Sequence, residues 1–292
     1  MKLDLRLNLP NEIRLSQHAK PMTHQEARVF FGRNLEEAGI EGAVELQTLS
    51  GYFDKSLAGS RKPLAVKTEK GVFVMKSYAC SEDKFEKQVL QNLNGFHSPK
   101  PVFLGNHFII EELLQYRQTL LDVFKADQEE AMRIGAETRA SLASRRITFY
   151  TDHNWLNDFV LSGIEWKCLD FGHSRPFCEK GENQALDSAT VTVKKHGDLF
   201  YLKDCGVAPF LKPYPQSPHY EEHKRVLNHL ATLKGDILTR INVYDSIRQA
   251  LFGIRDLLLI FAGEERLNVA FDIMNDVAPS YITNFVNKFN ST

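Results

Sequence analysis

The sequence has 292 residues, 43% of them hydrophobic and 25% charged, and its formal net charge is −1 at pH 7. This length allows one large core or two smaller lobes, and the balanced charge gives no indication of a nucleic-acid partner. The first residues alternate charges with leucine, unlike a signal peptide, and the longest apolar run, Leu257–Ala262, is too short to cross a membrane. The four cysteines lack zinc-ligand spacing. We therefore expect a cytoplasmic protein without a transmembrane segment.

Residues 1–42 precede the first strand-like segment. Thr23 is followed three residues later by Glu26, which is typical of a capping box at the start of a helix. We interpret 1–42 as an N-terminal extension that packs on the domain that follows it, with a regulatory or partner-docking role as the alternative.

A series of strand-like segments begins at Val44, where apolar and polar residues start to alternate. A Glu-Lys-Gly turn joins the second segment to the third, which ends at Lys76, and a proline-rich stretch leads into a fourth. The pattern predicts a small antiparallel sheet. The predicted first, second, third and fifth strands occupy 44–49, 63–68, 72–76 and 106–114.

A helix is predicted between the third and fourth strands. Ser81 is a suitable N-cap, and apolar residues recur at helical spacing from Phe85 to Leu93. Two acidic residues, Glu82 and Glu86, lie on this helix one turn apart.

The C-terminal part of the chain is predicted to be mostly helical, because apolar residues recur at spacings of three and four. A β-hairpin is expected about His196-Gly197, and Pro279 is expected to begin a last short helix. The predicted longer helices cover 118–144, 220–233, 243–262 and 264–277, and the predicted hairpin strands cover 189–195 and 198–203.

The segment Tyr150–Gly172 carries the residues that indicate a reaction. Asp152 stands five residues before Asn157 and eighteen before Asp170, which opens an Asp-Phe-Gly triplet. A hydrophobic hairpin about Ser162-Gly163 separates the last two. Phosphoryl transfer from a nucleotide needs a carboxylate to orient the acceptor hydroxyl, and an amide oxygen and a second carboxylate to hold Mg²⁺. The three side chains supply these groups in that order.

This pattern resembles the protein-kinase-like superfamily, which includes protein kinases, aminoglycoside and choline-type phosphotransferases, and lipopolysaccharide and RIO-type kinases. The resemblance implies an α+β, bilobal protein-kinase-like fold with a small antiparallel β-sheet N-lobe and a mainly helical C-lobe. On this basis residues 43–114 form the N-lobe. Residues 115–292 form the C-lobe, with the catalytic loop, the Asp-Phe-Gly triplet and an inserted β-hairpin.

The resemblance also assigns roles to individual residues. Lys76 falls where the family has its phosphate-binding lysine, and Glu86 matches the glutamate that orients that lysine, with Glu82 as the competing choice. Asp152 would be the catalytic base, and the two later residues of the motif would be the magnesium ligands.

Nucleotide binding is assigned to two further places. Gly51 and Gly59 lie where the family has its glycine-rich loop, and small residues there let backbone amides approach the phosphates. At the predicted hinge, Ile110 would stand at the back of the adenine pocket, while Glu111 and Leu113 would offer backbone groups to the base. The implied cofactors are ATP and Mg²⁺.

Several features differ from the family pattern. Tyr150 and Thr151 stand where a His-Arg or His-Gly pair usually precedes the aspartate, there is no Gly-x-Gly-x-x-Gly, and Ala208-Pro209-Phe210 is the nearest match to Ala-Pro-Glu. The segment His196–Leu199 reproduces the His-Gly-Asp-Leu start of the aminoglycoside phosphotransferase catalytic loop. Lys203 stands where the asparagine of that loop would follow, so we interpret the segment as a turn.

The sequence therefore predicts an ATP- and magnesium-dependent phosphotransferase, an atypical kinase, that moves the γ-phosphoryl group to a hydroxyl of a protein or small-molecule acceptor. Two alternatives remain open. One is a catalytically inactive pseudokinase that serves as a nucleotide-binding or scaffolding module. The other is a kinase-fold enzyme that transfers AMP.

Overall fold

A computed structural model of the chain describes residues 3–9, 20–49, 63–77, 84–106, 108–149, 155–172, 174–177, 193–196 and 199–202, separate positions between 229 and 253, and 267–292. The chain divides into two compact units, Met1–Gln115 and Tyr116–Thr292. The fold class is α+β, with a six-stranded sheet in the first unit and several helices in the second. Among the residues described, none of the helices combines the length and the apolar character needed to span a bilayer.

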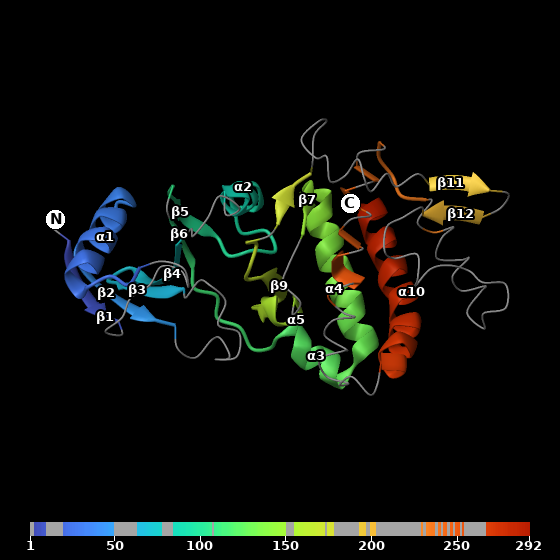
Figure 1. Cartoon of the computed structure of the whole chain (residues 1–292), viewed down its shortest axis with the longest axis horizontal. Coiled ribbons are helices and arrows are strands. Elements are labelled where there is room, and N and C mark those ends of the chain that lie inside the picture. The colour runs from blue at the N-terminus through green and yellow to red at the C-terminus, as the bar shows by residue number, and fades with distance from the viewer. Residues whose placement is uncertain are drawn as a thin grey trace. The chain divides into compact units, whose positions relative to one another are not determined.

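The N-terminal unit is built on a sheet whose strands are hydrogen-bonded in the order β1-β2-β3-β4-β6-β5 (Figure 1). Every neighbouring pair from β2 onward is antiparallel. The four strands for which the sequence predicts bounds are confirmed to within two residues at either end. The strands are β1 (Asp4–Asn8), β2 (Ala43–Thr48), β3 (Leu64–Thr68), β4 (Gly71–Ser77), β5 (Pro101–Leu104) and β6 (Phe108–Glu112).

The first strand, β1, is not predicted from the sequence, and it pairs with β2 in parallel, with Leu5 opposite Val44. The prediction of a purely antiparallel sheet is therefore wrong at this edge. Parallel neighbours require a crossover connection, usually a helix, and here α1 (His24–Glu37) lies between the two strands in the sequence. The N-terminal segment thus adds a strand to the sheet.

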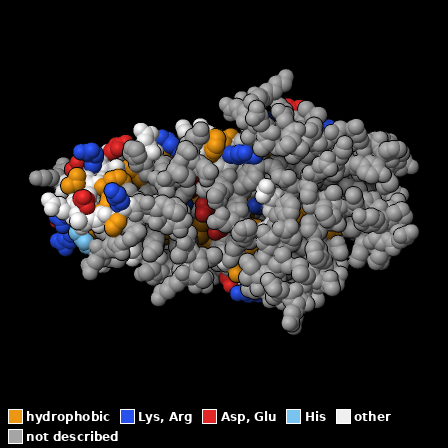
Figure 2. Space-filling view, in the orientation of Figure 1, with side chains coloured by type: hydrophobic (Ala, Val, Ile, Leu, Met, Phe, Trp, Pro, Cys, Tyr) orange, Lys and Arg blue, Asp and Glu red, His pale blue; other side chains and the backbone are white. Residues whose placement is uncertain are grey.

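The helix α1 starts at the predicted capping box and packs on the sheet. The Thr23 hydroxyl accepts a hydrogen bond from the Glu26 amide at 3.2 Å, and the Glu26 carboxylate accepts one from the Thr23 amide at 2.8 Å. The visible surface over α1 carries basic, acidic and apolar side chains interspersed, as expected for a solvated helix face (Figure 2). Its inward face belongs to a core made of Leu5, Ala27, Phe31, Leu35, Val44, Leu46, Val66, Met75, Phe108 and Ile110.

The second helix of this unit, α2 (Lys84–Leu93), lies where a helix is predicted. Val89 and Leu90 are fully buried, and Glu86 on the same helix is only 1% exposed. The predicted N-cap at Ser81 and the competing glutamate, Glu82, lie outside the described residues.

The C-terminal unit begins with two helices where the sequence predicts one over 118–144. They are α3 (Leu120–Ala126) and α4 (Gln128–Ser144). Asp127 lies between them in an extended conformation, and its side chain accepts a hydrogen bond from the Glu130 amide at 3.0 Å. The aspartate caps α4, because its carboxylate satisfies an amide that has no partner within the helix.

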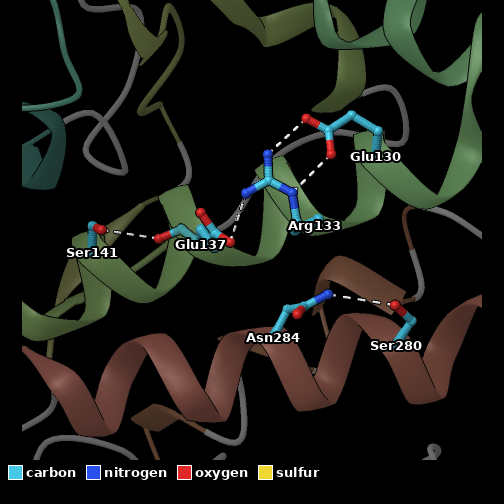
Figure 3. A network of polar contacts seen from close by, with 6 residues as sticks. All are labelled: Glu130, Arg133, Glu137, Ser141, Ser280 and Asn284. Carbon is cyan, nitrogen blue, oxygen red and sulfur yellow. Dashed lines mark hydrogen bonds and ion pairs between the residues drawn. The ribbon is translucent and has the colours of Figure 1, made fainter.

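The long C-terminal helix, α10 (Leu267–Ser291), packs against α4 (Figure 1). Pro279 lies inside this helix, so the prediction that it begins a separate short helix is wrong. Proline removes one backbone hydrogen bond from a helix, but packing against a neighbour can offset that loss. Figure 3 shows that the polar contacts of Arg133 on α4 and of Asn284 on α10 stay within their own helices. These contacts of Arg133 and Asn284 therefore do not join the two helices.

Three two-stranded sheets and a short helix complete the C-terminal unit as described. The hydrophobic hairpin about Ser162-Gly163 is confirmed, and Gly163 adopts a φ of 66°, which favours glycine at this turn. The second hairpin lies where the sequence predicts one. The elements are β7 (Ile147–Thr148) with β10 (Arg175–Pro176), β8 (Phe159–Ser162) with β9 (Glu165–Cys168), β11 (Val193–His196) with β12 (Leu199–Leu202), and the helix α5 (Trp155–Asp158).

Two helical glycines should respond in opposite ways to replacement by alanine. A Cβ at Gly135 would lie 2.6 Å from Cη2 of Trp155, whereas a Cβ at Gly32 would meet nothing closer than 3.9 Å. We expect Gly135→Ala to lower the free energy of unfolding by about 1–3 kcal/mol through overpacking. Gly32→Ala should raise it by about 0.5–1 kcal/mol, because alanine loses less entropy in a helix. Denaturant titration measures both values, and a stabilising Gly135→Ala would contradict the packing described.

Candidate functional site

In the N-terminal unit, Lys76 lies between two buried carboxylates. It is near the end of β4, and its Nζ is 3.7 Å from Oε1 of Glu86 on α2 and 2.7 Å from Oε1 of Glu111 on β6. The Lys76 side chain keeps 15% of its surface exposed, while those of Glu86 and Glu111 keep 1% and 3%. The structure thus brings together the predicted lysine and glutamate, and it adds a second glutamate at a shorter distance.

The position of Glu111 follows from the register of the sheet. Lys76 pairs with Ile109 and Val74 pairs with Glu111, so alternate residues of β4 and β6 point to the same face. From the sequence, Glu111 was expected to offer a backbone group at a hinge, and the contact made by its side chain was not predicted. The signal was present, because a glutamate two residues from Ile109 in an apolar strand must either face solvent or find a buried cation.

The register also determines on which face of the sheet Ile110 lies. This residue pairs with Met75, and both side chains belong to the core that contains α1, on the face opposite Lys76. Its side chain therefore does not lie on the face of the sheet that carries the lysine. Glu111 lies inside β6 in register with Val74 and Pro101, so its backbone is within the sheet. Leu113 follows the end of β6 and is half-buried, and its backbone role stays a prediction.

In the C-terminal unit, Asn157 and Asp170 lie just before and just after the β8–β9 hairpin. Phe159 pairs with Cys168, and one step beyond the strands the Leu169 amide donates a hydrogen bond to the Asp158 carbonyl at 2.8 Å. The next residues along the two chain segments are Asn157 and Asp170. The two residues therefore lie next to the open end of one hairpin.

The two predicted metal ligands differ in exposure. Asp170 is exposed, and its Oδ1 accepts a hydrogen bond from the Gly172 amide at 2.7 Å, which fixes the carboxylate above the turn. Asn157 lies on α5 and is half-buried. One carboxylate and one amide oxygen form the donor set that suits Mg²⁺, which keeps several waters and takes few protein ligands. Among the described residues no group of three or more His, Cys, Asp or Glu side chains could hold a metal ion.

The residue next to this pair is a buried thiol. Cys168 is fully buried, and its Sγ donates a hydrogen bond to the Asp170 carbonyl at 3.2 Å. Burial, followed by the negative charge of Asp158, raises the pKa of the Cys168 thiol well above its usual range. Cys168 is therefore a neutral core residue that supports the backbone of Asp170, as expected for an apolar strand position.

Three predicted site residues cannot be placed. Asp152, Gly51 and Gly59 lie outside the described residues. The residues on either side of the Asp152 segment are described, and both are buried: Phe149 and Trp155 are 0% and 1% exposed. The aspartate is thus carried by five residues, 150–154, between two buried aromatic anchors.

Comparison with known proteins gives only distant similarities. No protein-family model and no curated protein sequence matches the chain. The structure of an ethanolamine kinase from Plasmodium vivax has 12% sequence identity and a TM-score of 0.38, covering 99% of this chain and 100% of the other. That of a candidate aminoglycoside phosphotransferase from Ralstonia eutropha has 13% identity and a TM-score of 0.33, covering 87% of this chain and 96% of the other. Because both TM-scores are below 0.5, neither similarity carries an argument about the activity.

Removing the ammonium of Lys76 should destabilise the N-terminal unit strongly. Lys76→Met leaves two buried carboxylates without that cation, and breaking a buried ion pair costs about 3–5 kcal/mol in free energy of unfolding. Denaturant titration measures the loss. As a matched control, Lys67→Met removes an exposed lysine 4.0 Å from Glu45, which should change stability by less than about 1 kcal/mol.

The double variant Lys76→Met/Glu111→Gln tests whether Glu111 shares the lysine. It should recover part of the lost stability, since one buried carboxylate has become neutral. If the double variant is no more stable than Lys76→Met, Glu111 is not a partner of the lysine.

Proposed function

We propose that this protein is an ATP- and magnesium-dependent phosphotransferase of the protein-kinase-like type. The observation that supports the proposal is the β8–β9 hairpin, because Asn157 and Asp170 lie next to its two ends, as the motif requires. A second observation, the contact of Lys76 with Glu86, supports it independently. Chance would seldom give a lysine–glutamate pair and an asparagine–aspartate pair, each in the order that phosphoryl transfer requires.

In the proposed reaction, the residues of the C-terminal unit act on the acceptor and the metal. Asp152 would accept the proton of the acceptor hydroxyl as its oxygen bonds to the γ-phosphorus of ATP. The bond from that phosphorus to the β–γ bridging oxygen breaks, and ADP leaves. Asn157 and Asp170 would hold Mg²⁺, which neutralises phosphate charge when bound. Fixing the Asp170 carboxylate to the Gly172 amide reduces the entropy lost on binding a metal.

The residues of the N-terminal unit act on the phosphates in this proposal. The Lys76 ammonium binds phosphate oxygens, and Glu86 fixes the direction of its side chain. Because Glu111 is the nearer partner at 2.7 Å, the phosphates must draw the lysine away from a buried carboxylate or share it. The proposed acceptor is a hydroxyl group of a protein or of a small molecule. The sequence has no Ala-Pro-Glu segment, which would have favoured a peptide acceptor, so both classes stay in the proposal.

A non-catalytic nucleotide-binding role is the second candidate, and the short Lys76–Glu111 contact favours it. A lysine held by a buried carboxylate is less available to phosphates. The two candidates differ in one observable property, because only the enzyme transfers a phosphoryl group to an acceptor.

Nucleotide binding should stabilise the protein in a way that depends on Asp170. MgATP at about 100 times its Kd adds about 2.7 kcal/mol to the free energy of unfolding by mass action. We expect thermal unfolding with MgATP to shift upward for the wild type and much less for Asp170→Asn, which loses a charged metal ligand. Asp4→Asn, an exposed change of the same kind on β1, should behave as the wild type.

Transfer itself is then measured with labelled ATP and a panel of hydroxyl acceptors. Stabilisation without transfer would favour the non-catalytic role. The absence of any MgATP-dependent shift in the wild type would contradict both candidates.

A further inference from the structure

A buried arginine lies at the centre of the C-terminal unit and has no part in the proposed chemistry. Arg139 on α4 is 0% exposed. Its Nη1 donates to the Ser246 carbonyl and its Nη2 to the Phe149 carbonyl, both at 3.5 Å, which is long for a hydrogen bond. Its Nε has no hydrogen-bond partner among the described residues. Burial lowers the pKa of the Arg139 guanidinium, whereas the nearby Tyr281 hydroxyl acts in the opposite direction. An arginine in this environment still remains protonated.

The guanidinium stacks on two aromatic rings. Its Cζ is 4.6 Å from the ring centroid of Phe149 and 4.7 Å from that of Trp155. These residues are the anchors on either side of segment 150–154, which carries Asp152. One planar cation therefore contacts the residues on both sides of the segment, and a planar guanidinium is suited to such stacking.

Trp155 has little freedom to move. A Cβ on Gly135 would lie 2.6 Å from its ring and a Cβ on Gly253 would lie 2.5 Å from it, so the indole fits against two glycine backbones. Its Nε1 donates to the Ala250 carbonyl at 3.3 Å. Because α5 begins at Trp155, fixing this ring also fixes the start of the helix that carries Asn157.

Phe149 extends the same contacts to the Asp-Phe-Gly triplet. Its ring centroid is 5.5 Å from that of Phe171, the residue after Asp170, and 5.3 Å from that of Phe159. All of these rings are fully buried. The arginine is thus connected, through at most two aromatic contacts, to each of the three segments that carry Asp152, Asn157 and Asp170.

Stability alone does not account for an arginine here. A buried charge with long hydrogen bonds is costly to desolvate, and an apolar side chain of similar volume would generally serve a core at least as well. What arginine supplies is a flat group that can hold two rings at a fixed separation. We propose that Arg139 is a positioning residue that holds Phe149 and Trp155, the residues on either side of segment 150–154, and through them fixes the positions of Asn157 and Asp170. This inference rests on the proposed function.

The first test compares Arg139→Met with Arg133→Met, which changes the same residue type at a half-exposed position of the same helix. Both are made in a Trp166→Phe background, where Trp155 is the sole tryptophan. Amide hydrogen exchange of 149–157 and the near-ultraviolet circular dichroism of Trp155 report the position of the segment. We expect Arg139→Met to lose exchange protection and the Trp155 signal, and Arg133→Met to keep both.

The second test separates positioning from nucleotide binding. A misplacement of about 1 Å can reduce a rate about 100-fold, so we expect kcat to fall by about that factor while KM for MgATP changes less than about threefold. A merely structural role predicts lower stability with unchanged kcat at temperatures where the variant is folded. Unchanged exchange protection, or a kcat within twofold of the wild type, overturns the proposal.

Arg139→Lys covers the case in which the methionine variant does not fold. Lysine keeps the charge but loses the planar stack on both rings, so the same loss of protection and of kcat is expected. A lysine variant with wild-type protection overturns the proposal. If the wild type transfers no phosphoryl group, the proposed function fails, and the exchange of 149–157 still decides whether Arg139 positions this segment.

Discussion

The register of the β8–β9 hairpin is the constraint on which the proposed chemistry depends. Because Phe159 pairs with Cys168, Asn157 and Asp170 each lie two residues beyond this pair, at the open end of the hairpin. A slip of one residue would reverse the faces of every side chain in the hairpin. Register is set firmly when one face is buried, and Phe159, Val160 and Cys168 are fully buried. Core packing therefore determines where the polar ligands lie, although those ligands contribute little to the core.

Strand register also determines where charged side chains lie in the N-terminal unit. Strand alternation sets Lys76 and Glu111 on one face of adjacent strands, and α2 supplies Glu86 from above that face. The opposite face of the sheet is closed by α1, which holds Ile110 and Met75 in an apolar core. The other face carries the ammonium of Lys76 and the buried carboxyl groups near it. Such a buried polar network stabilises the fold only when the sheet and α2 hold all of its members in contact.

Local signals were readable from the sequence, and non-local ones were not. The capping box at Thr23, the Ser162-Gly163 turn and four strands of the sheet rest on neighbouring residues, and they are confirmed. The parallel pairing of β1 depends on a partner about forty residues away, and alternating leucines do not specify it. Pro279 stays inside α10 because α4 packs against that helix, a tertiary effect that outweighs local preference. The side-chain role of Glu111 was missed because a hinge was expected where the strand continues.

Charge balance around Lys76 bears on how a nucleotide would be accepted. Two buried carboxyl groups, those of Glu86 and Glu111, lie beside the ammonium of Lys76, and the phosphates of ATP would add negative charge there. Like charges in a region of low dielectric repel strongly. In the proposed reaction, a divalent ion bound to the phosphates would offset part of this repulsion. The proposed metal would thus assist nucleotide binding as well as transfer.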